Sequence, residues 1–296
     1  MPDLPLPLQQ DAVIQNNTTG QVDYLKFIGT TLVESALKDY GLGSAWKIVT
    51  SDFLNGDANP DLVAQNVNTG QVDFLFLDAN ANLIGSAAGS SVPHIVGVGL
   101  DFGTVAGQAG HTMVSQLANG QLDFLGFNAA GTLISSDLLA NTVGLPRAVG
   151  VAAGFNGAQT VNGVGNQDAV VTQLADGSVD FIGFNGSFAN KSLAFVASLV
   201  APGSAGTPAI GAINQNLTLN FNEVNPGANP TEAIHAISQL STIFPGRLDA
   251  VFFDSGKNDP THVGQEYATT LFDASFPGWH VVDGGLVAHV DLFPIV

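Results

Sequence analysis

The segment TGQVDFL at Thr69–Leu75 joins a polar turn to an apolar-Asp-apolar strand, and the chain carries five versions of this phrase. The other versions are TGQVDYL at Thr19–Leu25, NGQLDFL at Asn119–Leu125, DGSVDFI at Asp176–Ile182 and PGRLDAV at Pro245–Val251. Their glycines follow one another at spacings of 50, 50, 57 and 69 residues. A period near 50 residues is typical of propeller blades, which bury their faces only by packing on neighbouring blades. The repeat therefore predicts an all-β propeller.

Each repeat is expected to contain four strands. In the repeat quoted first, DLVAQ at Asp61–Gln65 is the second strand and the marker phrase supplies the third. Within Val72–Phe76, Val, Phe and Phe alternate onto one face, which is the pattern of a packed strand. A weaker fourth strand follows the marker phrase, as at Thr132–Ser136. The second strands of the other repeats begin at Asp11, His111, Asp168 and His235.

The innermost strands indicate how the ring closes. PHIVGVGLDF at Pro93–Phe102 aligns with PRAVGVAAGF at Pro146–Phe155, PAIGAINQNL at Pro208–Leu217 and WKIVTSDF at Trp46–Phe53. The first repeat has no such strand, but WHVVDGGL at Trp279–Leu286 matches it from the other end of the chain. Small residues in these segments suit strands crowded around an axis. Closure by a C-terminal strand also removes an exposed sheet edge.

We therefore expect a single domain over residues 1–296, a five-bladed β-propeller of four-stranded antiparallel blades. N-terminal and C-terminal strands share one blade. The expected blades cover approximately 279–296 plus 1–45, then 46–93, 94–146, 147–207 and 208–278. A β-solenoid is a minor alternative because its coils are much shorter than 50 residues. Two β-sandwiches are another, but they do not predict the match between the two ends of the chain.

Composition limits the classes of partner. Lys and Arg number 7 against 25 Asp and Glu, which gives a formal charge of −18. A chain with this much negative charge repels phosphate backbones and anionic lipid. Neither nucleic acid nor membrane is therefore an expected partner. The acidity either keeps a weakly charged surface soluble or gathers divalent cations outside the cell. The chain has no Cys, which excludes disulfides, thiolate catalysis and Cys-based zinc sites, and it has no apolar run long enough to span a membrane.

One loop in the second repeat is rich in oxygen ligands. SDFLNGDANPDLV at Ser51–Val63 offers four candidate metal ligands, which are Asp52, Asn55, Asp57 and Asp61. Calcium takes about six to eight oxygen ligands, and alternating Asp and Asn with a Gly for the turn supplies several of them from few residues. The alternative is a cation-free turn, because Asp and Asn favour turns through local hydrogen bonds.

At this loop the chain resembles the FG-GAP/VCBS repeats of integrin-like propellers, whose loop reads close to D-F-N-G-D-G-x-x-D-L. The residues that match in register are Asn55, Gly56, Asp57, Pro60, Asp61 and Leu62. The resemblance implies calcium at this blade. The chain departs from the family pattern at Leu54, which is inserted, and at Ala58, which replaces the usual Gly. The other repeats lack a complete set of carboxylates, so calcium is expected at one blade at most.

Other polar residues have two open interpretations. The recurring mid-strand aspartates are either five equivalent ligand sites between blades or acceptors of backbone hydrogen bonds that set strand register: Asp23, Asp73, Asp123, Asp180 and Asp249. An insertion in the fifth repeat carries Lys257, Asp259 and His262, which are weak candidates for ligand binding or members of a solvated loop. None of the six histidines has the spacing of a metal-ligand pair.

The sequence favours a non-catalytic binding or interaction propeller that is secreted or exposed at a surface. Its expected partners are a glycan, in the manner of the tachylectin-type propeller lectins, or a protein, including copies of itself. The alternative is a structural or self-assembling component of a surface layer or larger complex. A five-bladed glycoside hydrolase is less favoured, because Trp, Arg and Glu are scarce. No Gly-x-Ser-x-Gly, phosphate-binding loop or HExxH motif occurs.

The two ends of the chain bear on export. The N-terminal MPDLPLPLQQ lacks the basic and apolar regions of a signal peptide. The last residues, VDLFPIV at Val290–Val296, resemble the uncleaved C-terminal signal of proteins exported by type I secretion. A plain terminal strand explains this tail equally well. Export without a cleaved N-terminal signal is therefore the expectation.

Overall fold

The computed structural model describes residues 10–52, 54, 59, 61–99, 112–128, 131–152, 169–174, 179–185, 194–200, 219–224, 233–240, 246–254 and 266–283. Almost all the regular structure in these residues is β-strand. The first sheet has the order β20 (Trp279–Asp283), β1 (Gln10–Asn16), β2 (Val22–Ile28) and β3 (Thr31–Lys38). The second has β4 (Trp46–Asp52), β5 (Asp61–Asn66), β6 (Gln71–Leu77) and β7 (Leu83–Ser91).

The remaining strands follow the same plan. The third sheet contains β8 (His94–Gly99), β9 (Thr112–Gln116), β10 (Leu122–Phe127) and β11 (Leu133–Leu138). A short 3₁₀ helix, η1 (Ala140–Thr142), comes after β11. The last sheet contains β12 (Arg147–Ala152), β13 (Ala169–Gln173), β14 (Val179–Asn185), β15 (Ala194–Val200), β16 (Leu219–Val224), β17 (Ala233–Leu240), β18 (Arg247–Asp254) and β19 (Glu266–Ser275). Within the described residues no helix has the length and apolar character that crossing a bilayer requires.

The strands of the described residues form four sheets, not the five separate blades that the repeat predicted. Three sheets have four strands and the last has eight. In the eight-stranded sheet, β12 to β15 and β16 to β19 are antiparallel runs, and the inner strands β12 and β16 join them by parallel pairing. Gly150 lies opposite Leu219 there, and a strand glycine permits close approach of another backbone. The prediction was wrong in blade number because hydrogen bonds between these inner strands merge two repeats.

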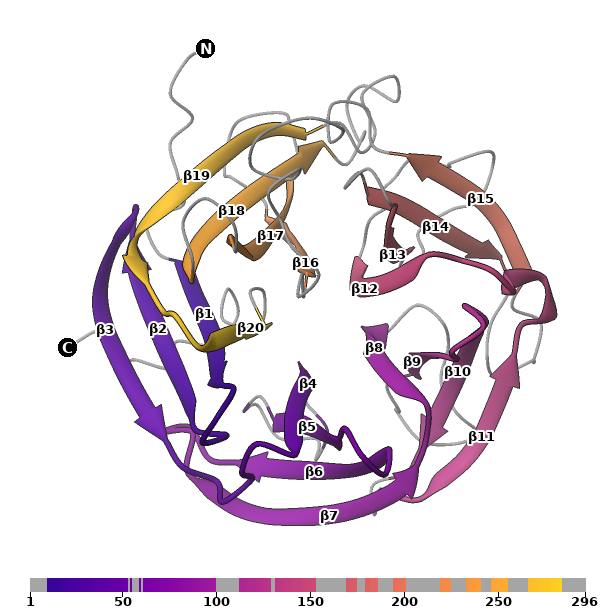
Figure 1. Ribbon diagram of the computed structural model, residues 1–296, viewed down its shortest axis with the longest axis horizontal. Coiled ribbons are helices and arrows are strands. Elements are labelled where there is room, and N and C mark those ends of the chain that lie inside the picture. Colours follow the sequence, from indigo (N-terminus) through magenta and orange to yellow (C-terminus); the bar gives the residue numbers. More distant parts are fainter. Residues whose placement is uncertain are drawn as a thin grey trace.

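The sheets surround a common centre (Figure 1). The inner strands β20, β4, β8, β12 and β16 lie around this centre, and the outer strands β3, β7, β11, β15 and β19 lie on the rim. Around the ring, β20 contacts β4, β4 contacts β8, and β8 contacts β12. The pairing of β12 with β16 and the contact of β17 with β20 complete the circuit. The all-β propeller arrangement of antiparallel sheets is thus confirmed.

The ring closes as the sequence predicted. β20 pairs antiparallel with β1, which places Gln15 opposite His280 and Asn16 opposite Trp279. The inner strands predicted at Trp46–Phe53 and Trp279–Leu286 correspond to β4 and β20. The segment Pro208–Leu217 lies outside the described residues, and the inner strand of that repeat is β16.

Apolar side chains from adjacent sheets interdigitate to form the core. The Phe74 ring of β6 meets Phe127 of β10 edge-on, with 5.3 Å between centroids. On the other side of the third sheet, Phe124 of β10 meets Phe184 of β14 at 5.2 Å. Every residue of β10 is buried, because this strand has a neighbouring sheet on each face. Such edge-to-face contacts add to the burial of apolar area that holds neighbouring sheets together.

The glycine of the marker turn is required by the backbone. Gly70 has a φ of +72°, and a Cβ at this position would lie 2.5 Å from the carbonyl oxygen of Val92. Gly20, Gly120 and Gly246 share both properties, each facing the segment that leads into the next inner strand. The marker turn therefore packs directly on the neighbouring repeat, and this explains why glycine recurs in the phrase.

A buried glutamine near the end of the second strand connects each of the first three sheets to the next sheet. The side-chain nitrogen of Gln65 donates to the carbonyls of Gly70 and Pro93 at 3.2 and 2.9 Å, and its oxygen accepts the N–H of Ile95 at 3.0 Å. Gln15 and Gln116 hold Ile48 and Ala148 in the same way, at 2.9 and 2.8 Å. These side chains fix the start of the next inner strand, which is where the candidate site lies.

Candidate functional site

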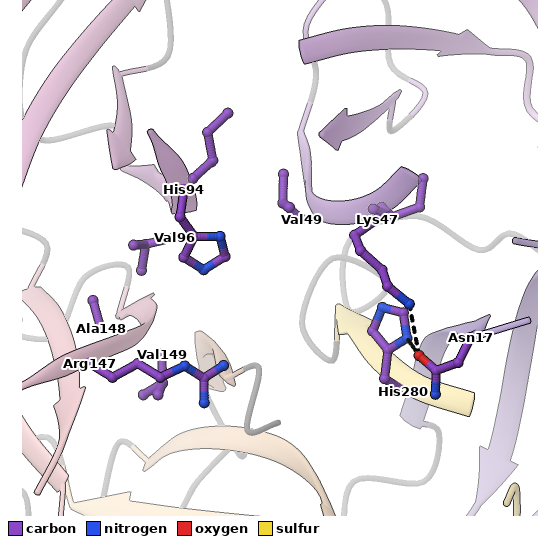
Figure 2. Close-up of a pocket in the computed structure, with 11 residues that line it drawn as sticks. Asn17, Lys47, Val49, His94, Val96, Arg147, Ala148, Val149 and His280 are labelled. Carbon is purple, nitrogen blue, oxygen red and sulfur yellow. Dashed lines mark hydrogen bonds between the residues drawn. The ribbon is translucent and has the colours of Figure 1, made fainter. Parts of the chain in front are cut away.

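A pocket opens among the inner strands at the centre of the ring. Its walls come from β4, β8, β12 and β20 and from the turn after β1, and its cavity volume is about 190 Å³. We call it the axial pocket. Four basic side chains line it, each from a different inner strand: Lys47, His94, Arg147 and His280 (Figure 2). Asn17 and apolar side chains that include Val49 and Val96 form the rest of the wall.

The four basic residues occupy equivalent positions in four inner strands. Each lies directly opposite the glutamine of its own second strand in the antiparallel pairing. The four pairs are Lys47 with Gln65, His94 with Gln116, Arg147 with Gln173 and His280 with Gln15. Three of the basic residues also precede a residue whose N–H is held by the glutamine of the preceding sheet. The repeat itself therefore carries these side chains to the same end of the ring.

On one side of the axial pocket, Asn17 holds two of the basic groups together. Lys47 Nζ donates to Asn17 Oδ1 at 2.8 Å, and His280 Nδ1 lies 2.8 Å from the same oxygen. His94 and Arg147 lie together across the pocket (Figure 2). Solvent reaches His94 and Arg147, while Lys47 and His280 are half-buried. Two pairs, each with one permanently charged group and one imidazole, thus face the same cavity.

The basic groups make one another harder to protonate. Burial lowers the pKa of His280 to about 4, and the charge of Lys47 adds to this effect, while a hydrogen bond with the backbone of Gln15 opposes it. Solvent still reaches part of the His94 ring, but the surrounding protein removes much of its hydration, and this desolvation together with the charge of Arg147 lowers its pKa. Burial also lowers the pKa of Lys47 and of Arg147. At neutral pH the two imidazoles are therefore neutral, and the pocket has the positive charges of Lys47 and Arg147.

This arrangement suits recognition of an anion. Among the described residues that line the axial pocket, none is Asp or Glu. Lys and Arg at neutral pH attract oxyanions, and the neutral imidazole of His94 adds an N–H donor. The chain as a whole has a charge of −18, so this cavity has the opposite sign to the rest of the molecule.

The predicted metal loop is only partly described. Asp61 is fully buried, and its two oxygens accept the N–H groups of Leu77 and Leu54 at 2.9 and 3.1 Å. Asn55 and Asp57 lie outside the described residues, and of Asp52 only the pairing with Asp61 at the end of β4 is described. No group of three or more metal-ligating side chains occurs within the described ranges. Asp61 thus has a structural role in closing its loop, and calcium binding there stays a prediction.

Two of the recurring aspartates hold the outer strand. Ser35 Oγ lies 2.9 and 2.8 Å from the carboxylate oxygens of Asp23, and Ser136 Oγ lies 2.8 and 2.9 Å from those of Asp123. A hydroxyl residue occupies the same register position in the other repeats, at Ser86, Ser198 and Thr269. These contacts support the interpretation that the aspartates set strand register.

Burial raises the pKa of Asp23, Asp73 and Asp123. The Ser hydroxyls and backbone N–H groups partly offset this effect for Asp23 and Asp123. Asp73 has a backbone hydrogen bond at Phe74, but its Oδ1 is buried with no hydrogen-bond partner in the described residues. Structural aspartates of this kind slightly lower the free energy of unfolding at neutral pH, while they fix the register of the strands.

The other predicted ligand-binding residues cannot be placed. Lys257, Asp259 and His262 lie outside the described residues. The residues of the axial pocket were not among the predicted site residues. A signal existed, because the aligned segments WKIV, PHIV, PRAV and WHVV each have a basic residue in second place. Its meaning depended on the convergence of these four strands at one point, which a linear alignment does not show.

No protein-family model matches the chain, and no curated protein matches it at a significant level. Solved structures with a similar course of the backbone include the Nup133 β-propeller domain of Vanderwaltozyma polyspora, with 9% identity and a TM-score of 0.41 over 90% of this chain and 75% of that one. An apocarotenoid oxygenase of Synechocystis has 8% identity and a TM-score of 0.33 over 91% of this chain and 59% of that one. At these values neither similarity bears on the function of this chain.

Proposed function

We propose that this protein is a non-catalytic binding propeller and that the axial pocket is its ligand site. The observation that supports this proposal is the convergence of four basic side chains, from four inner strands, on one cavity. Pockets at the centre of a repeat ring bring together side chains that are far apart in sequence, on strands that hold them rigidly. The ring thus acts as a frame, and the side chains at its centre select the ligand.

Carbohydrate remains among the proposed ligand classes, but acidic sugars are favoured over neutral ones. A neutral glycan site of the lectin type is built from aromatic faces and hydrogen-bonding groups, whereas the described wall of the axial pocket has basic and aliphatic side chains. An acidic sugar suits this wall better than a neutral one. A secreted or surface-exposed location stays a prediction from the sequence.

The test is thermal unfolding of the purified protein with a ligand panel. The panel contains neutral sugars (glucose and galactose), a sugar acid (glucuronate) and small carboxylates (succinate and citrate). A ligand at 100 times its dissociation constant stabilises the fold by about 2.7 kcal/mol, which raises the Tm measurably. Val49→Trp fills the axial pocket, and Val67→Trp is the matched control because Val67 is 60% exposed in a turn.

The proposal requires that a ligand raise the Tm of the wild type and of Val67→Trp but not of Val49→Trp. A ligand that stabilises all three proteins equally binds elsewhere on the molecule and contradicts it. A panel without any stabilising ligand also counts against this site.

A second candidate, self-association, is favoured by the outer strands. β3, β7 and β11 are sheet edges, and each exposes large apolar side chains. These are Val33, Leu37, Leu83, Ile84, Ile134 and Leu138, of which Ile84 is the most exposed at 61%. An uncovered sheet edge with apolar side chains is a template for pairing with another chain. Sedimentation velocity over a range of concentrations checks this: a larger species that Ile84→Lys removes supports rim association, and a monomer at every concentration contradicts it.

A further inference from the structure

Basic side chains are scarce in this chain, and several of them face one cavity. The whole sequence has seven Lys and Arg against 25 Asp and Glu, yet Lys47 and Arg147 both line the axial pocket. Two of the six histidines, His94 and His280, lie beside them. Groups of like charge at close range repel one another, and a bound anion relieves that repulsion. The collection of cations at one point in an acidic protein therefore favours an anionic ligand.

The four groups form two pairs on opposite walls. Lys47 and His280 share the Asn17 oxygen, and they come from the adjacent strands β4 and β20. His94 and Arg147 come from the adjacent strands β8 and β12. Figure 2 shows the first pair on one side of the cavity and the second pair on the other side. A ligand between them faces both pairs.

Each wall has one full charge at neutral pH. Lys47 and Arg147 supply the charges, and the lowered pKa values of His280 and His94 keep both imidazoles neutral. Asn17 Oδ1 can only accept, so the single N–H of neutral His280 is donated to it, and Lys47 is the group that holds an oxyanion on that wall. On the other wall an oxyanion has several acceptor oxygens, so it can bind Arg147 and the imidazole N–H of His94 together. The two walls thus match a ligand with two negative groups.

The size of the cavity favours a small ligand. Its volume is about 190 Å³. Pockets for drug-sized ligands usually measure about 300–1,000 Å³. The axial pocket therefore suits a compact molecule. Aliphatic wall residues such as Val49 and Val96 can cover the carbon skeleton of such a ligand.

We propose, on the basis of the function proposed above, that the axial pocket binds a small molecule with two oxyanion groups, one held by Lys47 and the other by Arg147 and His94. Carboxylate, phosphate and sulfate share this chemistry. The ligand lies across the pocket with one negative group at each wall. Neutral sugars of the same size lack both contacts.

The experiment is calorimetric titration at low ionic strength and neutral pH. The probes are succinate and citrate, with acetate for a single carboxylate, inorganic phosphate and sulfate for other oxyanions, and glucose as the neutral molecule. We expect succinate or citrate to bind at least about tenfold more tightly than acetate, because two charge-assisted contacts replace one. Raising the salt from about 20 to 200 mM weakens this binding, since it shortens the Debye length.

Two variants test the two walls separately. Lys47→Gln and Arg147→Gln each remove one charge from the axial pocket, and each is expected to weaken dicarboxylate binding by at least about tenfold. Lys38→Gln and Arg247→Gln are the matched controls, because they remove the same charges outside the pocket lining. Their affinities should remain within about twofold of the wild type. A Tm close to that of the wild type checks that each variant is folded.

The outcomes separate this inference from the proposed function. Equal weakening by pocket and control variants indicates general charge attraction and overturns the inference. If glucose binds, Val49→Trp blocks this binding and no dicarboxylate binds, the proposed site is supported and the inference that it binds oxyanions is overturned. Binding of no probe in the axial pocket contradicts both. Tighter binding of phosphate than of the dicarboxylates overturns the two-group ligand.

Discussion

Lys47 Nζ and His280 Nδ1 hydrogen-bond to the same atom, Asn17 Oδ1, at 2.8 Å each. Since Asn17 is neutral, it gathers the two basic groups without compensating their charge. Asn17→Asp places a carboxylate at this point. We expect the variant to raise the pKa of His280 above its value of about 4 and to weaken dicarboxylate binding about tenfold, because the new charge neutralises Lys47 and repels an anionic ligand.

NMR titration of the His280 ring measures the first effect and calorimetry the second. The control is Asn68→Asp, which adds the same charge at an exposed position of the corresponding turn in the next repeat. If both variants weaken binding equally, the effect of Asn17→Asp comes from net charge alone.

Stability below pH 6.5 should depend on His280. Its pKa is about 4 in the folded protein against an ordinary value of 6.5, so the unfolded chain binds more protons between these two pH values. The free energy of unfolding therefore falls as the pH is lowered from 6.5 to 4. His280→Gln removes this contribution. We expect its loss of stability over the window to be smaller than that of the wild type by roughly 1–2 kcal/mol, since the ring is partly exposed to solvent.

Urea unfolding at a series of pH values gives this difference. The comparison between variant and wild type is necessary because Asp23, Asp73 and Asp123 act in the opposite direction. Their pKa values are raised above 3.8, so their contribution to stability grows as the pH falls towards that value. Identical slopes for the two proteins would contradict the assignment to His280.

Gln65→Leu should destabilise the protein by about 2–4 kcal/mol, because it leaves the buried N–H of Ile95 and the carbonyl of Pro93 without their partner. Chemical denaturation measures the change. Gln21→Leu is the matched control, since the side chain of Gln21 accepts an exposed hydrogen bond from Thr19 within its turn, and a change below about 0.5 kcal/mol is expected there. Since His94 directly precedes Ile95, Gln65→Leu should also weaken dicarboxylate binding.

Gly70→Ala and Gly29→Ala separate backbone strain from steric overlap. Both glycines have positive φ, +72° and +59°, but only at Gly70 does an added Cβ meet another atom, the carbonyl oxygen of Val92. We expect Gly29→Ala to cost about 1–2 kcal/mol from backbone conformation alone. Gly70→Ala should cost several kcal/mol more, since the overlap separates two repeats. Equal Tm values for the two variants would mean that the turn does not pack as closely as described.

Asp61 offers a test of the calcium hypothesis. Its carboxylate holds two backbone N–H groups, so Asp61→Ala should lower the Tm in EDTA by an amount equivalent to about 2–3 kcal/mol. If the loop also binds calcium, the ion raises the Tm of the wild type and not that of Asp57→Ala. An unchanged wild-type Tm in calcium and in EDTA leaves Asp61 with its structural role alone.

The local elements of this fold could be predicted from sequence because each repeat specifies them independently. Alternation in Val72–Phe76 predicted a strand within β6, and the matching segments at Trp46 and Trp279 predicted β4 and β20. The parallel pairing of β12 with β16 had no such local signal. It arises from the approach of two inner strands in the assembled ring, and it reduces the number of sheets to four.

The candidate site was harder to predict for a related physical reason. Asp61 belongs to a compact sequence motif and was therefore a predicted metal ligand, yet its oxygens accept hydrogen bonds from backbone N–H groups. Lys47 and Arg147 are 100 residues apart, and their equivalent places in aligned segments do not show that they share a pocket. The cavity exists only after four separate strands have been placed around one centre. A repeat pattern predicts equivalent positions, but it does not say which of them converge.

The closing strand β20 also determines when the axial pocket comes into existence. His280 and Asn17 are 263 residues apart in sequence, and they meet only when β20 docks beside β1. Contacts of such high sequence separation form late, because much of the chain must first be ordered between them. During synthesis β1 is made early, whereas β20, which pairs with its other edge, is made only after nearly the entire chain. Ligand capture by this pocket thus distinguishes finished molecules from those whose ring is still open.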